Sequence, residues 1–220
     1  TYQFEAEQAS KVALIDSDKG KAWPIDELVP GCGDTMLELI ESFPSIKDRL
    51  KPSGDGIPLG QVTFCAPIPR PARNILCVGK NYHAHAKEFA DSGYDSSSTG
   101  AADAIPESPL VFTKAPNTVI ASGDPIPRHR GITEQVDYEA ELAVIIGPGG
   151  RGIKKADAYK HVWGYTITND VTARDLQAKH KQWFIGKSLD GFCPMGPWIV
   201  TADEVDPENL AIRCWINGEL

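Results

Sequence analysis

The first 66 residues alternate short apolar runs with turn residues, and this pattern predicts a small unit of strands with one helix. The apolar run at residues 11–15 predicts a short strand. Asp34 is the predicted N-cap of a helix over residues 35–41, and Pro44 lies just past the predicted end. Residues 1–66 are therefore expected to form a small N-terminal accessory domain.

Three prolines between residues 66 and 71 predict an extended, semi-rigid linker into a larger domain over residues 67–220. An apolar face at spacing i, i+4, i+7, i+8 predicts a helix over residues 82–90. Small and polar residues at 91–108 predict a surface excursion, which is either a plain loop or a lid over a site. The remaining apolar runs predict strands at 74–79, 110–113, 137–146, 162–168, 198–201 and 211–216, and the second half of 137–146 is of the fully buried type. The pattern indicates a mainly β fold with short helices, of the α+β class.

The composition of the chain excludes some classes of binding partner but says less about the fold. Hydrophobic residues make up 41% and charged residues 24% of the 220 residues, as in ordinary globular proteins. No apolar run approaches the ~18 residues of a membrane span, so no membrane partner is expected. Acidic residues outnumber basic ones, 30 to 22, which argues against nucleic acid. Five scattered cysteines with no C-x-x-C, and no signal peptide, favour a reducing, cytoplasmic location.

The end of the sequence predicts an incomplete hairpin. The strand expected at 211–216 leads into Asn217-Gly218, the strongest two-residue hairpin turn signal. Only two residues follow, too few for a return strand. We therefore expect that C-terminal sequence is missing from this chain.

A cluster of acidic residues is the feature of the sequence that says most about its chemistry. Asp137, Glu139 and Glu141 lie at i, i+2, i+4, so on one strand they share a face. The alternatives are a solvated edge or a divalent cation site, since carboxylate oxygens suit a hard cation such as Mg²⁺. Asp170 follows the strand predicted at 162–168, where it is either a third ligand or a helix cap.

Three further groups are candidates for catalysis or binding. His85 and Glu88 are i, i+3 neighbours on the predicted helix, either a surface pair or a general base with its orienting carboxylate. Lys187 lies in a glycine-punctuated loop, as a solvated side chain or as a group that stabilises an oxyanion or enolate. Arg174 is either a surface ion pair or a bidentate clamp on a substrate carboxylate.

Taken in order, these segments resemble the fumarylacetoacetate hydrolase family, in the branch that includes acylpyruvate hydrolases, oxaloacetate decarboxylases and hydroxyheptadienedioate isomerases. The resemblance covers about residues 74–220 and rests on the segments 78–88, 109–114, 137–142, 164–177, 186–191 and 194–198. It implies a mixed β-sandwich roll with a small N-terminal domain, usually assembled as a homodimer. The family normally continues with a second half of the roll, which this sequence lacks.

The resemblance also implies roles for individual residues. Mg²⁺ or Mn²⁺ would be held by three carboxylates, matching Glu139, Glu141 and Asp170. Asp137 precedes this pair and is not a usual direct ligand. The remaining matches are the His85–Glu88 dyad that activates water, Lys187 for the oxyanion, and Arg174 and Gln177 for substrate contacts.

The resemblance implies an enzyme acting on a small 2-keto or 1,3-dicarbonyl acid, with C–C bond hydrolysis of an acylpyruvate or fumarylpyruvate as the main prediction. Two alternative reactions would use the same site residues: decarboxylation of an oxaloacetate-type acid, and isomerisation of a hydroxymuconate- or hydroxyheptadienedioate-type diacid in aromatic catabolism. A metal-binding, non-catalytic paralogue is the alternative outside enzymes.

Overall fold

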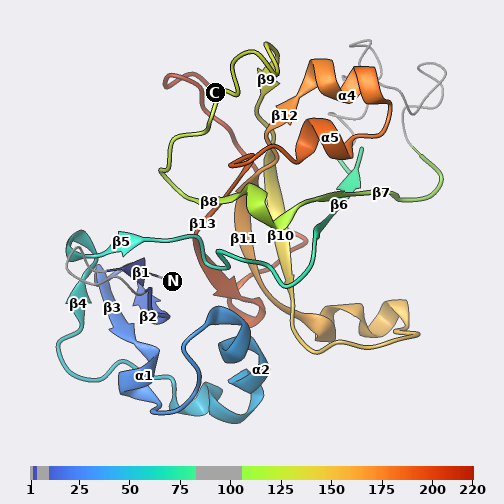
Figure 1. Ribbon diagram of the computed structural model, residues 1–220. Coiled ribbons are helices and arrows are strands. Elements are labelled where there is room, and N and C mark those ends of the chain that lie inside the picture. The colour runs from blue at the N-terminus through green and yellow to red at the C-terminus, as the bar shows by residue number, and fades with distance from the viewer. Residues whose placement is uncertain (1, 4–9, 83–105) are drawn as a thin grey trace.

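A four-stranded mixed sheet lies at the centre of the molecule (Figure 1). The structure is a computed structural model, and it describes residues 2–3, 10–82 and 106–220. The strand order is β10–β11–β13–β8. Its first three strands pair antiparallel, whereas β13 and β8 pair parallel. The four strands are β8 (Val119–Ala121), β10 (Ala140–Ile146), β11 (Val162–Asn169) and β13 (Cys193–Thr201).

Smaller elements surround one end of this sheet. Two antiparallel pairs lie there, β6 (Ile75–Gly79) with β7 (Leu110–Lys114), and β9 (Val136–Asp137) with β12 (Thr172–Ala173). Helices α4 (Arg174–His180) and α5 (Phe184–Lys187) follow β12 and lie against each other (Figure 1). Short 3-10 turns occupy Pro116–Thr118, Lys155–His161 and Ala202–Glu204.

The N-terminal part is a separate small sheet with two helices. Strands β2 (Ala13–Asp16), β3 (Lys21–Pro24) and β4 (Ile57–Pro58) pair antiparallel. Helices α1 (Ile25–Leu28) and α2 (Met36–Ile46) follow β3 (Figure 1). Strand β1 (Tyr2–Gln3) pairs with β5 (Thr63–Phe64), and 3-10 turns lie at Lys47–Arg49 and Leu59–Gln61.

Helix α2 differs at both ends from the helix predicted over 35–41. Its N-cap is Thr35, not Asp34, because Thr35 Oγ1 accepts from the Glu38 N–H at 3.2 Å while Glu38 Oε2 accepts from the Thr35 N–H at 2.9 Å. This reciprocal capping box satisfies two N–H groups at the helix start. The helix also runs on to Ile46 with Pro44 in its last turn, so the proline did not end it.

One core joins the N-terminal part to the central sheet. Buried Met36, Leu39 and Ile46 of α2 pack in the same cluster as Ile145 of β10 and Met195 of β13. The proline segment contributes buried Ala66 and Ile68 to this cluster, so it is packed into the core. The division into two domains at residue 66 stays a prediction.

The prediction of a single strand over 137–146 is wrong, because this segment forms two strands. Val136 and Asp137 pair with β12, and the chain then leaves that pairing at Tyr138 and Glu139 before β10 begins at Ala140. Asp137 therefore lies on a different strand from Glu141. The second half is also not fully buried, since Val144 is 46% and Ile146 60% exposed.

The turn at the end of the sequence forms, but the strand before it does not. Asn217 and Gly218 take φ of 52° and 87°, as a two-residue hairpin turn requires. Ile216 and Glu219 exchange backbone hydrogen bonds of 2.8 and 3.0 Å across it. Residues 211–215 form no ladder with any described residue, so the strand predicted at 211–216 is wrong.

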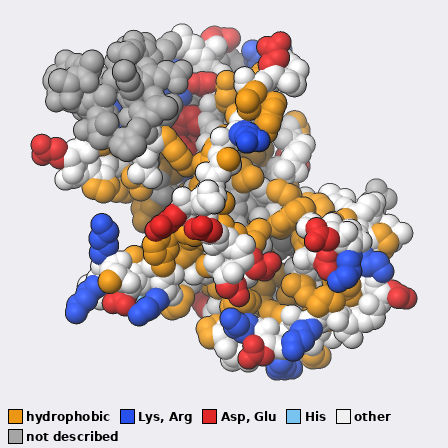
Figure 2. Space-filling view, turned by 180° about the vertical axis from the view of Figure 1, so that it is seen from behind, with side chains coloured by type: hydrophobic (Ala, Val, Ile, Leu, Met, Phe, Trp, Pro, Cys, Tyr) orange, Lys and Arg blue, Asp and Glu red, His pale blue; other side chains and the backbone are white. Residues whose placement is uncertain are grey.

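Several large apolar side chains remain exposed in the described part of the chain. Leu76 on β6, Val111 on β7 and Ile167 on β11 are each more than half exposed. Figure 2 shows apolar side chains gathered across the middle of the face seen from behind. Within the described ranges, no helix has the length and apolar character needed to span a bilayer. All five cysteines are free.

Candidate active site

Backbone pairing places three of the predicted site acids at one end of the central sheet. Ala140 at the start of β10 pairs with Asn169 at the end of β11. The Asp170 N–H donates to the Glu139 carbonyl at 2.8 Å, and the Glu139 N–H donates to Asn169 Oδ1 at 3.0 Å. Glu139 and Asp170 therefore face each other directly beyond the ladder. Glu141 lies two residues further along β10 and lines the same cavity.

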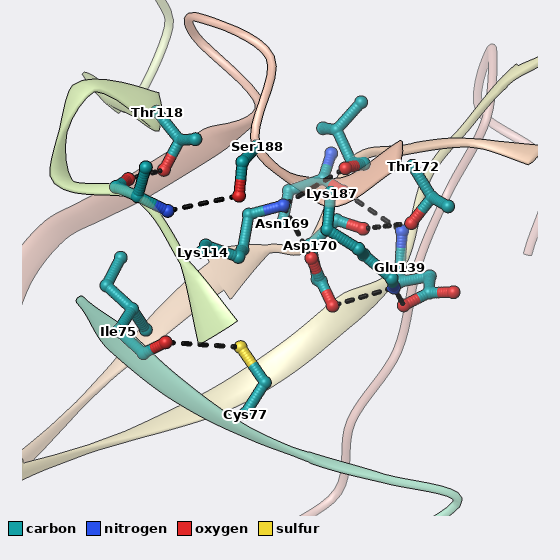
Figure 3. Close-up of polar contacts among 12 residues, drawn as sticks. Ile75, Cys77, Lys114, Thr118, Glu139, Asn169, Asp170, Thr172, Lys187 and Ser188 are labelled. Atoms are coloured by element: carbon teal, nitrogen blue, oxygen red, sulfur yellow. Dashed lines mark hydrogen bonds and ion pairs between the residues drawn. The ribbon is translucent and has the colours of Figure 1, made fainter. Parts of the chain in front are cut away.

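A close approach between two helices brings Lys187 to these acids. Gly186 is buried, and a Cβ on it would lie 2.8 Å from the Ala173 carbonyl oxygen and from the Gln177 nitrogen. Only glycine lets α5 lie this close to the start of α4. Lys187, the next residue, then donates from Nζ to Glu139 Oε2 at 2.6 Å and to Asp170 Oδ2 at 2.8 Å (Figure 3).

A second buried lysine holds Asp170 from the other side. Lys114, at the end of β7, is 1% exposed, and its Nζ lies 2.6 Å from Asp170 Oδ1 (Figure 3). The same ammonium group donates to the Val171 carbonyl at 3.1 Å. Sequence reasoning assigned Lys114 no role. The available signal was a lysine that ends an apolar strand, a position that looks equally like a solvated strand end.

The charges in this cluster act strongly on one another. Burial opposes the charge on Asp170, but the ammonium groups of Lys187 and Lys114 outweigh it, so the pKa of Asp170 lies below its ordinary value. Burial likewise opposes the charge on Lys187, but Asp170 and Glu139 raise its pKa above the ordinary value. The described site thus contains buried ion pairs in their charged form.

Glu141 behaves in the opposite way. Burial, together with the negative charges of Asp170 and Glu139, raises the pKa of Glu141 to about 7. A hydrogen bond from Tyr82 only partly offsets this. The Tyr82 hydroxyl also accepts from the Leu142 N–H at 3.4 Å. Glu141 is therefore the carboxylate whose negative charge the site compensates least.

Arg174 and Gln177 are buried on α4 and line the cavity. Arg174 donates from Nη1 to Gln177 Oε1 at 3.0 Å and from Nη2 to Glu139 Oε1 at 2.6 Å. Its Nε donates to Asp137 Oδ2 at 2.9 Å. The guanidinium group thus contacts protein groups on three sides, and its predicted contact with substrate stays a prediction.

A cavity of about 710 Å³ opens over these residues. Glu139, Glu141, Asp170, Lys114 and Lys187 form its polar end, and aromatic side chains, including Phe112 and Trp183, form part of its wall. The rings of Phe112 and Trp183 meet edge to face at 5.2 Å, and Lys187 Nζ lies 5.2 Å from the centre of the Phe112 ring. Cys77 also lines the cavity, and burial raises its pKa to about 12, which keeps it protonated.

The predicted metal ligands fit a divalent cation in their chemistry. Three carboxylates line one cavity, and hard oxygen donors of this kind suit Mg²⁺ or Mn²⁺. Such a cation would stabilise the negative charge of Glu141, which the site compensates least. Among residues 10–82 and 106–220, however, no three acidic, histidine or cysteine side chains converge on one point. Lys187 lies between Glu139 and Asp170, so a cation shared by all three carboxylates requires its ammonium group to shift.

His85 and Glu88 lie outside the described residues, as do most of the helix predicted over 82–90 and the excursion predicted over 91–108. Their pairing and their role as a water-activating dyad stay predictions.

Buried carboxylates and lysines thus lie together at the end of a mixed sheet and line one cavity, an arrangement suited to binding a small charged molecule. Residues 74–220 match the family described as "Fumarylacetoacetate (FAA) hydrolase C-terminal". The chain belongs to this family, which confirms the resemblance and the fold predicted from it.

Named relatives refine this result. The chain is 53% identical over 163 residues to oxaloacetate tautomerase YisK of Bacillus subtilis, a match that covers 74% of this chain and 51% of the relative. It thus spans about half the length of that protein. A solved structure of a fumarylacetoacetate hydrolase from Exiguobacterium antarcticum aligns with a TM-score of 0.68 and 39% identity, over 94% of this chain and 68% of the other.

A third relative is a maleylpyruvate hydrolase from Sphingobium sp. SYK-6, whose structure contains manganese(II) and pyruvate. It aligns with a TM-score of 0.66 and 28% identity, over 90% of this chain and 66% of the other. The relatives named as hydrolases bear on the hydrolysis prediction only at the level of the family, and the tautomerase relative fits the isomerisation alternative better than it fits that main prediction.

Proposed function

We propose that this chain is the site-bearing part of a divalent-metal-dependent enzyme that interconverts the keto and enol forms of oxaloacetate or a similar 2-keto diacid. The observation that carries this is the buried Lys187, bound to both Glu139 and Asp170 at the polar end of a deep cavity. The name of the Bacillus relative supplies the substrate.

Keto–enol exchange needs only proton transfer. One proton leaves the carbon next to the keto group, and one reaches the keto oxygen, so no water attacks and no C–C bond breaks. A bound Mg²⁺ or Mn²⁺, held by Glu139, Glu141 and Asp170, would supply Lewis-acid stabilisation of the negative charge that develops on the substrate oxygens.

Lys187 is suited to stabilise the enolate. Its ammonium group has three N–H donors, and the two carboxylates accept two of them. Once the ammonium group shifts to make room for a cation, its N–H donors are available for the oxygen on which charge develops, inside a cavity where such a hydrogen bond is stronger than in water. The raised pKa of Lys187 keeps the group charged at neutral pH.

His85, oriented by Glu88, is proposed as the base that moves the proton at carbon. The same base would activate water in a hydrolase, so this dyad does not by itself choose the reaction. Gln177, fully buried at the cavity wall and bound to Arg174, is proposed to orient the substrate.

Hydrolysis of an acylpyruvate is the second candidate, because the Sphingobium relative named as a maleylpyruvate hydrolase aligns over 90% of this chain. It needs the same metal and the same lysine, together with a water molecule at the distal carbonyl.

The test uses the full-length protein with Mn²⁺ and enol oxaloacetate, whose disappearance is followed by its ultraviolet absorbance. Lys187→Met is expected to reduce the rate by about 100-fold or more, the usual loss when one oxyanion donor is removed. Lys179→Met, on the exposed end of α4, is the matched control and is expected to keep the wild-type rate. Equal rates for Lys187→Met and wild type would contradict the proposal.

A further inference from the structure

Asp137 belongs to the acidic segment of the sequence but not to the cavity. Its side chain is 42% exposed, against 11% for Glu139, and it lines a different pocket of about 350 Å³. The pairing of β9 with β12, with Asp137 opposite Thr172, fixes its backbone. The interruption of the strand at Tyr138 and Glu139 is what turns Asp137 away from the cavity.

Arg174 connects Asp137 to the site. Asp137 Oδ2 accepts from Arg174 Nε at 2.9 Å and lies 2.8 Å from Nη2. The same Nη2 donates to Glu139 Oε1 at 2.6 Å. The guanidinium group thus shares one nitrogen between a carboxylate outside the cavity and a proposed metal ligand inside it.

The backbone on either side leaves this arrangement little freedom. The Arg174 N–H donates to the Gln135 carbonyl at 2.8 Å, next to the β9–β12 pair. Asp137 Oδ1 accepts from the Tyr138 N–H at 2.9 Å, which fixes the carboxylate plane. A planar guanidinium held by a fixed carboxylate has one orientation, and that orientation sets where Nη1 and Nη2 meet Gln177 and Glu139.

We propose that Asp137 is a positioning residue that acts through Arg174. It holds the guanidinium in place and takes a share of its positive charge, so that less of that charge falls on Glu139 and more of the Glu139 negative charge can serve a divalent cation. Without Asp137, Arg174 turns its charge more fully onto Glu139, and Glu139 becomes a poorer ligand. This inference rests on the proposed function in one respect, that Glu139 is a metal ligand.

The experiment measures the dissociation constant of Mn²⁺ for the full-length protein by electron paramagnetic resonance, beside kcat and KM for oxaloacetate. Asp137→Ala removes both the acceptor and the charge, and is expected to weaken Mn²⁺ binding by about 10-fold or more, as for other partners that orient a ligand. Asp137→Asn keeps an acceptor oxygen and is expected to lie between Asp137→Ala and wild type. Because Asp137 does not line the cavity, kcat at a fixed, subsaturating Mn²⁺ concentration should fall while KM changes little.

Two controls separate a positioning role from a general loss of structure. Asp157→Asn breaks an exposed ion pair of 2.7 Å with Lys160 and is expected to leave the Mn²⁺ constant unchanged. In the Arg174→Gln background, Asp137→Asn should add no further loss, since its effect passes through Arg174. If Asp137→Ala does not fold, the nearly isosteric Asp137→Asn decides the question.

Wild-type Mn²⁺ affinity in a folded Asp137→Asn and Asp137→Ala protein would overturn the inference, as would equal losses from Asp137→Asn in the wild-type and Arg174→Gln backgrounds. Weakened Mn²⁺ binding in a protein without oxaloacetate activity would uphold the role of Asp137 and refute the proposed function instead. Absence of Mn²⁺ binding in the wild type would overturn both.

Discussion

The sharpest test of the buried charge cluster is Lys114→Met. Methionine keeps most of the apolar stem of lysine and removes the ammonium group, which now lies 2.6 Å from Asp170 Oδ1 and 3.1 Å from the Val171 carbonyl. Both side chains are nearly inaccessible, at 1% and 9%. The substitution therefore leaves a buried carboxylate with one cation instead of two.

Removing one partner of a buried ion pair costs about 3–5 kcal/mol. Asp170 keeps Lys187 at 2.8 Å, so we expect the lower end of that range, about 3 kcal/mol less free energy of unfolding. At ~2–4 °C per kcal/mol for a chain of this size, Tm should fall by about 6–12 °C. Since the pKa of Asp170 is lowered in the folded protein, the contribution of its ion pairs to the free energy of unfolding is present at neutral pH. That contribution is lost as pH falls through the lowered pKa.

The assay is urea unfolding at pH 7, followed by tryptophan fluorescence. Lys160→Met is the matched control: its ion pair with Asp157 is also short, at 2.7 Å, but Lys160 is 75% exposed. An exposed pair contributes about 0–1 kcal/mol. If Lys114→Met costs no more than Lys160→Met, burial does not make the Lys114–Asp170 pair important, and the reasoning fails.

Three further predictions follow from the site. The raised pKa of Glu141, about 7 against an ordinary 4.5, favours its protonated form in the folded protein. The free energy of unfolding of the metal-free protein should therefore fall as pH rises from about 4.5 to 7. Glu141→Gln should abolish that loss, as measured by urea titrations at pH 5 and 8. Gly79→Ala places a Cβ 2.4 Å from the Trp183 ring, so it should shift tryptophan fluorescence and cost about 1–3 kcal/mol, while Gly149→Ala, with open space around it, should be silent in both readouts. His85→Ala should keep Mn²⁺ binding and lose turnover; unchanged turnover would refute its assignment as the base.

Local pattern was sufficient for much of the fold. Strands β6, β7 and β11 lie within about one residue of the prediction, because short apolar runs bounded by turn residues admit few other structures. The misses have tertiary causes. The strand at 137–146 is interrupted because Asp137 pairs with β12 while Ala140 pairs with β11. Pro44 stays within α2 because that helix packs on the core through Ile46, which lies beyond the predicted end at residue 41.

The sequence predicted which residues form the site, but not which of their side chains contact one another. The sequence grouped Glu139, Glu141, Asp170 and Lys187, and the structure places all four at one cavity. Its sign of Lys114 was only a lysine at the end of an apolar strand, because a pairing across 56 residues leaves no local pattern. The engagement of Arg174 with Asp137 and Glu139 is likewise a product of the fold.

The decisive experiment on the proposed activity measures keto–enol exchange of oxaloacetate by the full-length protein, with Mn²⁺ and with EDTA, while pyruvate is assayed in the same sample against an enzyme-free blank. We expect rapid exchange that EDTA abolishes, with no pyruvate above the blank. Pyruvate formation without accelerated exchange would show a decarboxylase and contradict the proposed activity.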